Sequence, residues 1–288
     1  MALPRLIDIA KSNIIAYQNK YDVMSDDDKD KIQSVKQSIT PSINMETDAL
    51  LSTLKDRYKN RFELCSEAND ITVNEFKKLS IEQQTELIIE KINPKYRQFG
   101  IRRVDFSNRY EDGLRLYYLA PYMGFSAGNS KYGKYCICAK PLFLDTDVVL
   151  KHDSLRHYFN KKNEYNEDAC HRDLLPYNKA ELLILDKYSE QIISSSVETI
   201  RRFVEMDSDP FEIMTTTLLN ADKIETVVIS FEDYKYISEL NKKKLRIGYS
   251  EPLESKEEED LRNYLRLQRE LRLHGINIRI AKKMSEAI

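Results

Sequence analysis

Residues 177–185 read Tyr177-Asn178-Lys179-Ala180-Glu181-Leu182-Leu183-Ile184-Leu185, which places one carboxylate at the head of a short apolar run. The apolar run has the length of a buried strand and is too short to predict a helix. A glutamate at the mouth of such a strand is held by rigid backbone near solvent, which suits a catalytic acid or base. The alternative is a glutamate at a strand edge that only faces water, and composition alone favours this alternative.

The composition is that of a globular protein with a substantial core. Hydrophobic residues make up 41% of the 288 residues and charged residues make up 32%, which argues against a disordered chain. The net charge of −2 gives no overall basic field, so any contact with a nucleic acid would have to be local. No apolar run approaches the ~18–20 residues of a membrane span, and Asp8 and Lys11 interrupt the first apolar residues. We therefore expect a cytoplasmic protein without membrane contact.

The cysteines and glycines exclude several common sites. Cys65, Cys136, Cys138 and Cys170 are too sparse for a disulfide framework, which fits a reducing compartment. A zinc site completed by Cys170 and His171 is the alternative, but a single C-x-C without a second pair favours small buried hydrophobic residues. The seven glycines form neither G-x-G-x-x-G nor a Walker loop, so a Rossmann or P-loop nucleotide site is not expected. We predict no metal ligands.

The first part of the chain, residues 1–95, predicts helices. Apolar residues recur at helical spacing, and residues that favour helix starts precede several segments. Ser25 stands before three aspartates, and Ser80-Ile81-Glu82-Gln83 resembles a capping box. The helices are expected at residues 3–24, 29–38, 45–68, after Thr72, and at 81–92.

From residue 96 the pattern predicts a mixture of strands and helices. Strands are expected at residues 101–106, 114–119, 134–139 with 142–144, 182–185, 223–230, 245–249 and 276–281. Helices are expected at residues 153–160, 196–206, 210–220, 232–243 and 255–274. The prediction is an α+β fold with a helical N-terminal region, 1–95, and an α+β domain, 96–288, that is expected to be catalytic and to carry a helical insertion at about 190–220.

Asp145 and Asp147 form the most suggestive metal pattern. Two carboxylates spaced two apart at a strand end could hold a divalent ion on a sugar-nucleotide diphosphate. The segment looks like the D-x-D motif of GT-A glycosyltransferases, but the residues before it predict helices rather than a nucleotide-binding α/β half. An aspartate-rich turn is the alternative.

Two further catalytic patterns fail at a key residue. A metal-dependent nuclease would place Glu-x-Lys on one strand face, but Leu183 stands where the lysine after Glu181 is required. His152 and His157 flank a predicted helix start, and no serine or cysteine nucleophile is placed beside either. We expect them to be helix-start or surface histidines.

One family resemblance follows from these residues. The segment 178–184 is similar to the glutamate strand of DarT-like ADP-ribosyltransferases, in which an Ala-Glu-aliphatic-aliphatic-Val run carries the catalytic glutamate. Residues 114–123 look like the family's aromatic strand and the turn after it, and residues 223–230 look like its closing strand. Arg97, with Arg102 and Arg103 behind it, falls where the family has an arginine that helps to bind NAD. The similarity spans residues 95–230 at most.

The resemblance implies an NAD-dependent ADP-ribosyltransferase, which breaks the nicotinamide–ribose bond through an oxocarbenium-like state. A carboxylate beside that ribose can offset the growing positive charge, and an arginine suits the NAD diphosphate. The implied catalytic residues are Glu181 and Arg97. The implied residues for NAD, the substrate, are Arg102, Arg103, Tyr118, Tyr122, Ser126 and Asn129.

The resemblance also implies partners. Enzymes of this family modify DNA or RNA, usually as bacterial toxins, so a nucleic-acid acceptor, a role in phage defence and a restraining antitoxin are expected. Lys161, Lys162 and the pair His171-Arg172 would give the acceptor a local basic rim. The competing hypothesis is a non-enzymatic interaction or regulatory module, in which residues 1–95 and 255–274 bind a partner. A deep cleft holding Glu181 together with an arginine would favour the enzyme.

Overall fold

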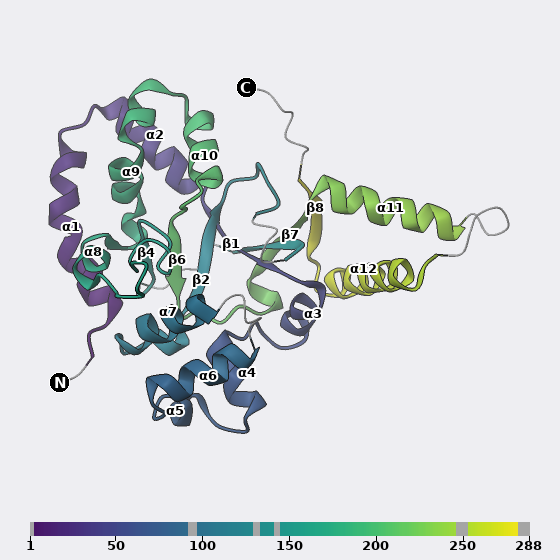
Figure 1. The fold of residues 1–288 in the computed structure, drawn as a ribbon. Coiled ribbons are helices and arrows are strands. Elements are labelled where there is room, and N and C mark those ends of the chain that lie inside the picture. The colour runs from purple at the N-terminus through teal and green to yellow at the C-terminus, as the bar shows by residue number, and fades with distance from the viewer. Residues whose placement is uncertain (1–2, 92–96, 129–132, 141–144, 246–252, 282–288) are drawn as a thin grey trace. The chain divides into compact units, whose positions relative to one another are not determined.

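The computed structural model describes residues 3–91, 97–128, 133–140, 145–245 and 253–281 (Figure 1). The fold is α+β, as predicted. The chain divides into two compact units, each assembled from separate stretches of sequence. The first unit comprises Met1–Ile39, Lys59–Pro121 and Phe143–Thr217, and the second comprises Thr40–Tyr58, Tyr122–Leu142 and Leu218–Ile288. This division differs from the predicted boundary at residue 95, because both units draw on the N-terminal region.

The first unit combines an antiparallel group of strands with helices. Its strands are β2 (Tyr117–Tyr122, ending at the unit boundary), β4 (Val148–Leu150), β5 (Leu174–Pro176) and β6 (Glu212–Thr215), in the order β5-β4-β6-β2. Its helices are α1 (Leu6–Asp22), α2 (Asp26–Gln37), α4 (Arg61–Ala68), α5 (Val73–Phe76), α6 (Ile81–Lys91), α7 (Arg97–Asn108), α8 (Glu167–Arg172), α9 (Ala180–Ser194) and α10 (Val197–Met206). The short 3-10 helices η2 (Gly113–Arg115) and η4 (Tyr177–Lys179) precede β2 and α9.

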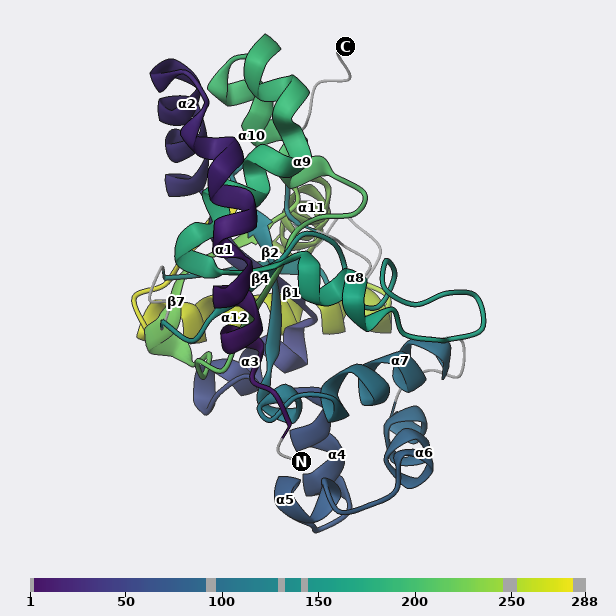
Figure 2. The ribbon, with the colours of Figure 1, turned by 90° about the vertical axis from the view of Figure 1, so that its left-hand side faces the viewer.

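Two hydrophobic clusters hold the first unit together. Helices α1, α2, α9 and α10 pack against one another (Figure 2), and α1 also packs on β5 in a core with Phe106 and Leu150. Helices α4, α5, α6 and α7 enclose a smaller core around Phe62 and Phe76. Strand β4 is fully buried between β5 and β6, which fixes the segments on either side of it.

The second unit packs three helices on its own group of strands. The strands are β1 (Thr40–Met45), β3 (Tyr135–Ala139), β7 (Ile224–Ile229) and β8 (Asn277–Ile280), in the order β1-β3-β7-β8. Pairing is antiparallel except between β7 and β8, which are parallel. The helices are α3 (Thr47–Lys55), α11 (Phe231–Leu245) and α12 (Ser255–Leu273), with the 3-10 helix η5 (Ala221–Lys223) before β7. Helices α11 and α12 form the long connection that a parallel pair requires.

Several predictions from local signals are confirmed. Helices α1, α2, α10, α11 and α12 and strands β3, β7 and β8 lie where they were expected. Ser25 caps α2 by accepting a hydrogen bond from the Asp28 amide, and Ser80 and Gln83 form the predicted reciprocal cap of α6. Gly275 ends α12 with a φ of 66°, a left-handed conformation that glycine adopts without strain. The segments 142–144 and 246–249 lie outside the described residues.

The predicted strand at Glu181 is wrong, because the residues belong to helix α9. The apolar run continues past residue 185 with Tyr188 and Ile192 on the buried side, so the full segment has helical periodicity. Ala, Leu, Glu, Lys and Gln also favour the helix. A window of four apolar residues is compatible with a strand or a helix, and here the periodicity of the longer segment favours the helix.

Other segments differ from prediction for similar reasons. Residues 101–106 alternate like a strand but lie inside α7, and 45–68 is split into α3 and α4. Residues 153–160 form turns, and α8 occupies part of the expected loop before Asp173. Residues 210–220 were expected to be a helix but contain β6, whose Ile213 and Thr215 suit a strand. Strand β1 interrupts the predicted helical region, and η2 (Gly113–Arg115) takes up the start of the strand expected at 114–119.

Candidate metal centre

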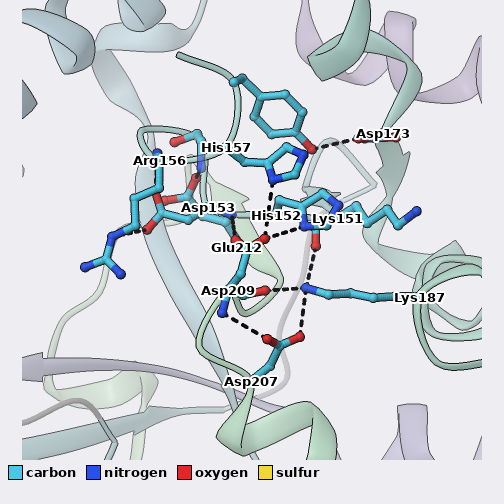
Figure 3. Close-up of polar contacts among 12 residues, drawn as sticks. Lys151, His152, Asp153, Arg156, His157, Asp173, Lys187, Asp207, Asp209 and Glu212 are labelled. Carbon is cyan, nitrogen blue, oxygen red and sulfur yellow. Dashed lines mark hydrogen bonds and ion pairs between the residues drawn. The ribbon is translucent and has the colours of Figure 1, made fainter. Parts of the chain in front are cut away.

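Strand β4 brings three polar segments of the first unit to one place. Leu150 at its end is paired with Leu174 of β5 on one side and with Glu212 of β6 on the other. The residues just beyond these positions, which are His152, Asp173 and Asp209, are therefore neighbours although they are far apart in sequence. Figure 3 shows their side chains converging.

His152, His157 and Asp173 form a cluster of potential metal ligands. Each offers one nitrogen or oxygen atom, and these atoms lie within 4.8 Å of one another. The two imidazole rings are stacked, with centroids 3.8 Å apart and planes 7° apart. Asp173 is buried, His152 is partly exposed and His157 is exposed, so one side of the cluster is open to solvent.

Asp209 determines which ring nitrogen of His152 carries the proton. Its Oδ2 atom lies 2.5 Å from His152 Nδ1 and 3.5 Å from His157 Nδ1, and its Oδ1 atom accepts a hydrogen bond from the Asp153 amide. Burial raises the pKa of Asp209, but the hydrogen bonds from His152 and Asp153 outweigh it and hold the pKa at about 2. The ionised carboxylate can only accept, so His152 Nδ1 must donate. In the neutral ring Nε2 then carries a lone pair.

Neighbouring groups also orient Asp173 and lower the pKa of His157. The hydroxyl of Tyr158 donates a hydrogen bond to Asp173 Oδ2 at 3.1 Å, which orients the carboxylate. Burial lowers the pKa of His157, and the nearby His152 lowers it further. The neutral imidazole is the form that binds metals.

Buried ion pairs hold the segments around this cluster. Lys187 is only 9% exposed and lies 3.0 Å from Asp207 Oδ2. It also donates hydrogen bonds to the carbonyl oxygens of Lys151, at 3.0 Å, and Asp209. On the neighbouring side Asp186 pairs with Lys151 at 2.5 Å. These contacts tie α9 to the end of β4 and to the loop before β6.

Glu212 places a second titratable carboxylate beside the cluster. Its Oε2 atom accepts a hydrogen bond from the Ser154 amide, two residues after His152, and its Oε1 atom lies 3.8 Å from Arg103. Burial raises the pKa of Glu212 to about 7, against the lowering effect of Arg103. The guanidinium of Arg103 lies over the Tyr118 ring, 3.5 Å from its centroid. A carboxyl group that titrates near neutral pH suits proton transfer.

The predicted catalytic pair is not brought into contact. Glu181 lies in the first turn of α9 and is buried, with Oε2 2.6 Å from Lys36 and Oε1 3.9 Å from Lys179. Arg97 is exposed and pairs with Glu86 at 2.9 Å. The ion-pair partners of Glu181 are thus lysines. Its predicted catalytic role stays a prediction.

The residues predicted to bind NAD are placed separately. Arg102 donates to the carbonyl oxygens of Leu155 and Asn160 and holds the turn that carries His157, while Arg103 and Tyr118 stack beside Glu212. In the second unit Tyr122 is buried and Ser126 accepts a hydrogen bond from the Gly128 amide. Asn129 lies outside the described residues.

The other sequence candidates also differ from one another in their surroundings. Asp147 is buried whereas Asp145 is exposed. The four cysteines are buried, which confirms the expectation of small buried residues. Burial raises the pKa of the Cys170 thiol to about 12, so it stays protonated.

The sequence singled out His152 and His157 but gave them no role. Asp173, Asp209 and Glu212 were missed, because only strand pairing joins them to the histidines. The available signal was the H-x-x-x-x-H spacing directly after a buried strand, followed later by Asp-Pro-Phe-Glu at residues 209–212. Neither segment is a known metal motif by itself.

No protein-family model matches the chain, and a search of curated proteins finds no match either. Neither comparison bears on the resemblance to DarT-like ADP-ribosyltransferases, which stays a prediction. Within the part of the chain that the structure describes, the helices are too short or too polar to cross a membrane.

Proposed function

We propose that His152, His157 and Asp173 bind one divalent transition-metal ion and that the first unit is a metal-dependent hydrolase. The observation that carries this proposal is the convergence of three ligand atoms within 4.8 Å, from segments held by strand pairing. Two imidazoles and one carboxylate are a donor set found in catalytic zinc sites and in non-haem iron sites.

The surroundings of the cluster support a metal rather than a purely structural contact. Asp209 binds the Nδ1 side of His152 and leaves Nε2 for an ion, as carboxylates do behind metal-bound histidines. Tyr158 orients Asp173 in the same way. Structural zinc sites are usually closed by four protein ligands, whereas here His157 is exposed. The cluster is therefore open to solvent on the side of His157.

The chemistry that such an ion supplies is a lowered pKa of bound water and polarisation of a substrate oxygen. The protein contributes the positions of the ligands and a carboxyl group whose protonation changes near neutral pH. Glu212 is that group, since burial holds its pKa at about 7 and the Ser154 amide orients it. We assign Glu212 the role of a proton-transfer group next to the cluster.

Metal binding is tested first by titrating metal-free protein with Zn²⁺, Mn²⁺ and Co²⁺ in a calorimeter. One ion bound per chain, with binding lost in His152→Ala and His157→Ala, would support the centre. His274→Ala is the matched control, because His274 is an exposed histidine in the second unit. Equal binding by all four proteins would remove the proposal.

Hydrolysis is tested with the metal-loaded protein on p-nitrophenyl acetate and bis(p-nitrophenyl) phosphate. Turnover that requires the metal and falls in Glu212→Gln without a change in metal affinity would support the hydrolase. Binding of the ion without turnover of either reporter would leave a metal-binding protein and remove the hydrolase.

NAD-dependent ADP-ribosyl transfer to DNA or RNA stays a separate prediction from sequence, as does the interaction module. The ADP-ribosyl transfer is tested by measuring the transfer of label from radiolabelled NAD to nucleic acid or protein, with Glu181→Ala as the control. Transfer by the wild type alone would support it. Absence of transfer, together with no change in melting temperature on adding NAD, would remove it.

A further inference from the structure

Helix α12 of the second unit has one apolar face and one basic face. Its apolar face is buried in the core of that unit through Leu261, Tyr264, Leu267 and Leu271. The four arginines of this helix are all exposed: Arg262, Arg266, Arg269 and Arg272. At 3.6 residues per turn the first three fall within about 60° around the helix, directly opposite the buried side, with Arg272 at the edge.

No ion pair or hydrogen bond joins the side chains of these four arginines to the residues that the structure describes. Arginines elsewhere commonly have such contacts; Arg109, for example, pairs with both Asp105 and Glu167. An exposed arginine row that the fold leaves unpaired is available to an external anion.

The acidic residues of α12 lie mostly at its other end. Four of them precede the first arginine, namely Glu257, Glu258, Glu259 and Asp260. The acidic residue between Arg262 and Arg272 is Glu270. Glu257 is paired with Lys243 of α11, which lies beside α12 (Figure 1). Four positive charges against one negative charge therefore make residues 262–272 of the helix a strongly basic surface.

The spacing of the row fits a repeating anion. Arg262 and Arg272 are ten positions apart, which is about 15 Å along the helix axis. Guanidinium groups bind phosphates through paired hydrogen bonds, and an arginine row can follow several phosphates of one nucleic-acid backbone. An anionic membrane fits less well, because a helix that lies in a membrane surface inserts its apolar face. In α12 that face is buried in the core.

We propose that the row Arg262, Arg266, Arg269 and Arg272 binds the phosphate backbone of a nucleic acid without reading its sequence. The overall charge of −2 makes this local surface the determinant of binding. The proposal depends on the second unit alone and does not require the candidate metal centre.

The test is the anisotropy of a fluorescein-labelled duplex DNA and of a single strand, titrated with the full chain over a range of salt concentrations. The test variant is Arg266→Glu with Arg269→Glu. The matched control is Lys77→Glu with Lys78→Glu, which makes the same change of charge at exposed residues of the first unit. A third variant, Arg266→Lys with Arg269→Lys, keeps the charge. Circular dichroism melts confirm that each variant is folded.

We expect the wild type to bind either probe and the arginine reversal to weaken binding at least tenfold. Its slope of log K against log salt should fall by about 2, since each lost phosphate contact removes about 0.9 from a duplex. The lysine control should bind like the wild type, and the Arg→Lys variant should lie between. The proposal is overturned if the wild type binds neither probe or if both charge reversals weaken binding equally.

Discussion

Glu181 and Asp209 are two carboxylates of the first unit with opposite surroundings. Glu181 is enclosed in the first turn of α9, and lysines provide its ion pairs. Asp209 lies in a loop beside His152 and His157, which form the cluster together with Asp173. The first is a charge that the fold neutralises, and the second belongs to a group of side chains with an open side. A conspicuous residue within an apolar run thus indicates burial, whereas a site requires the convergence of several segments.

The largest effect expected from this comparison concerns the metal ligands. His152→Ala removes one of three ligands, so affinity for Zn²⁺ should fall by about 100-fold or more, beyond the effect of losing an outer partner. Glu181→Ala should leave the affinity unchanged, because its contacts are with Lys36 and Lys179. Calorimetric titration of both variants with Zn²⁺ measures the two affinities. Equal losses of Zn²⁺ affinity in the two variants would mean that the cluster at His152 and the surroundings of Glu181 are not independent.

The second prediction concerns the partner behind the histidine. Asp209→Asn keeps the shape of the side chain but removes the charge that fixes the His152 proton. We expect metal affinity to fall by about 10- to 100-fold, the usual effect of losing such a partner. Metal content measured at several free Zn²⁺ concentrations is the readout. Unchanged affinity would show that Asp209 serves the loop alone, through its hydrogen bond to the Asp153 amide.

The third prediction concerns stability at Glu181. Glu181→Ala leaves Lys36 without its carboxylate, and we expect the free energy of unfolding to fall by about 2 kcal/mol. This lies below the usual cost of breaking a fully buried pair, because Lys36 is partly exposed. The double variant Lys36→Met, Glu181→Leu should recover most of the loss. Urea denaturation measures all three proteins, and a single variant as stable as the wild type would contradict a structural role.

The same comparison explains what the sequence could predict. Local signals sufficed for α12, whose buried residues recur at helical spacing and whose end is set by Gly275, and for β7 with its run of β-branched residues. They failed for β6, where Pro210 indicated a helix start but pairing with β4 imposes a strand. The site itself joins His152 to Asp209, 57 residues apart. No local pattern contains that contact, since it depends on the order of the strands.

The smallest expected effect is the dependence of stability on pH at Glu212. The folded protein keeps this carboxyl group protonated up to about pH 7, because burial raises its pKa, whereas the unfolded chain releases the proton near the ordinary value of about 4.3. Between these values the folded state binds more protons, so stability falls as pH rises. Glu212→Gln removes this loss.

We therefore expect Glu212→Gln and the wild type to be similar at about pH 4, with the variant more stable by on the order of 1 kcal/mol at about pH 8. Urea denaturation of the metal-free proteins across this range measures the difference. Asp145→Asn is the control, since Asp145 is exposed. If wild type gained stability relative to Glu212→Gln as pH rises, Glu212 would be ionised in the folded protein and paired with Arg103. It would then belong with Glu181, as a charge that the fold neutralises, and not with the open cluster at His152.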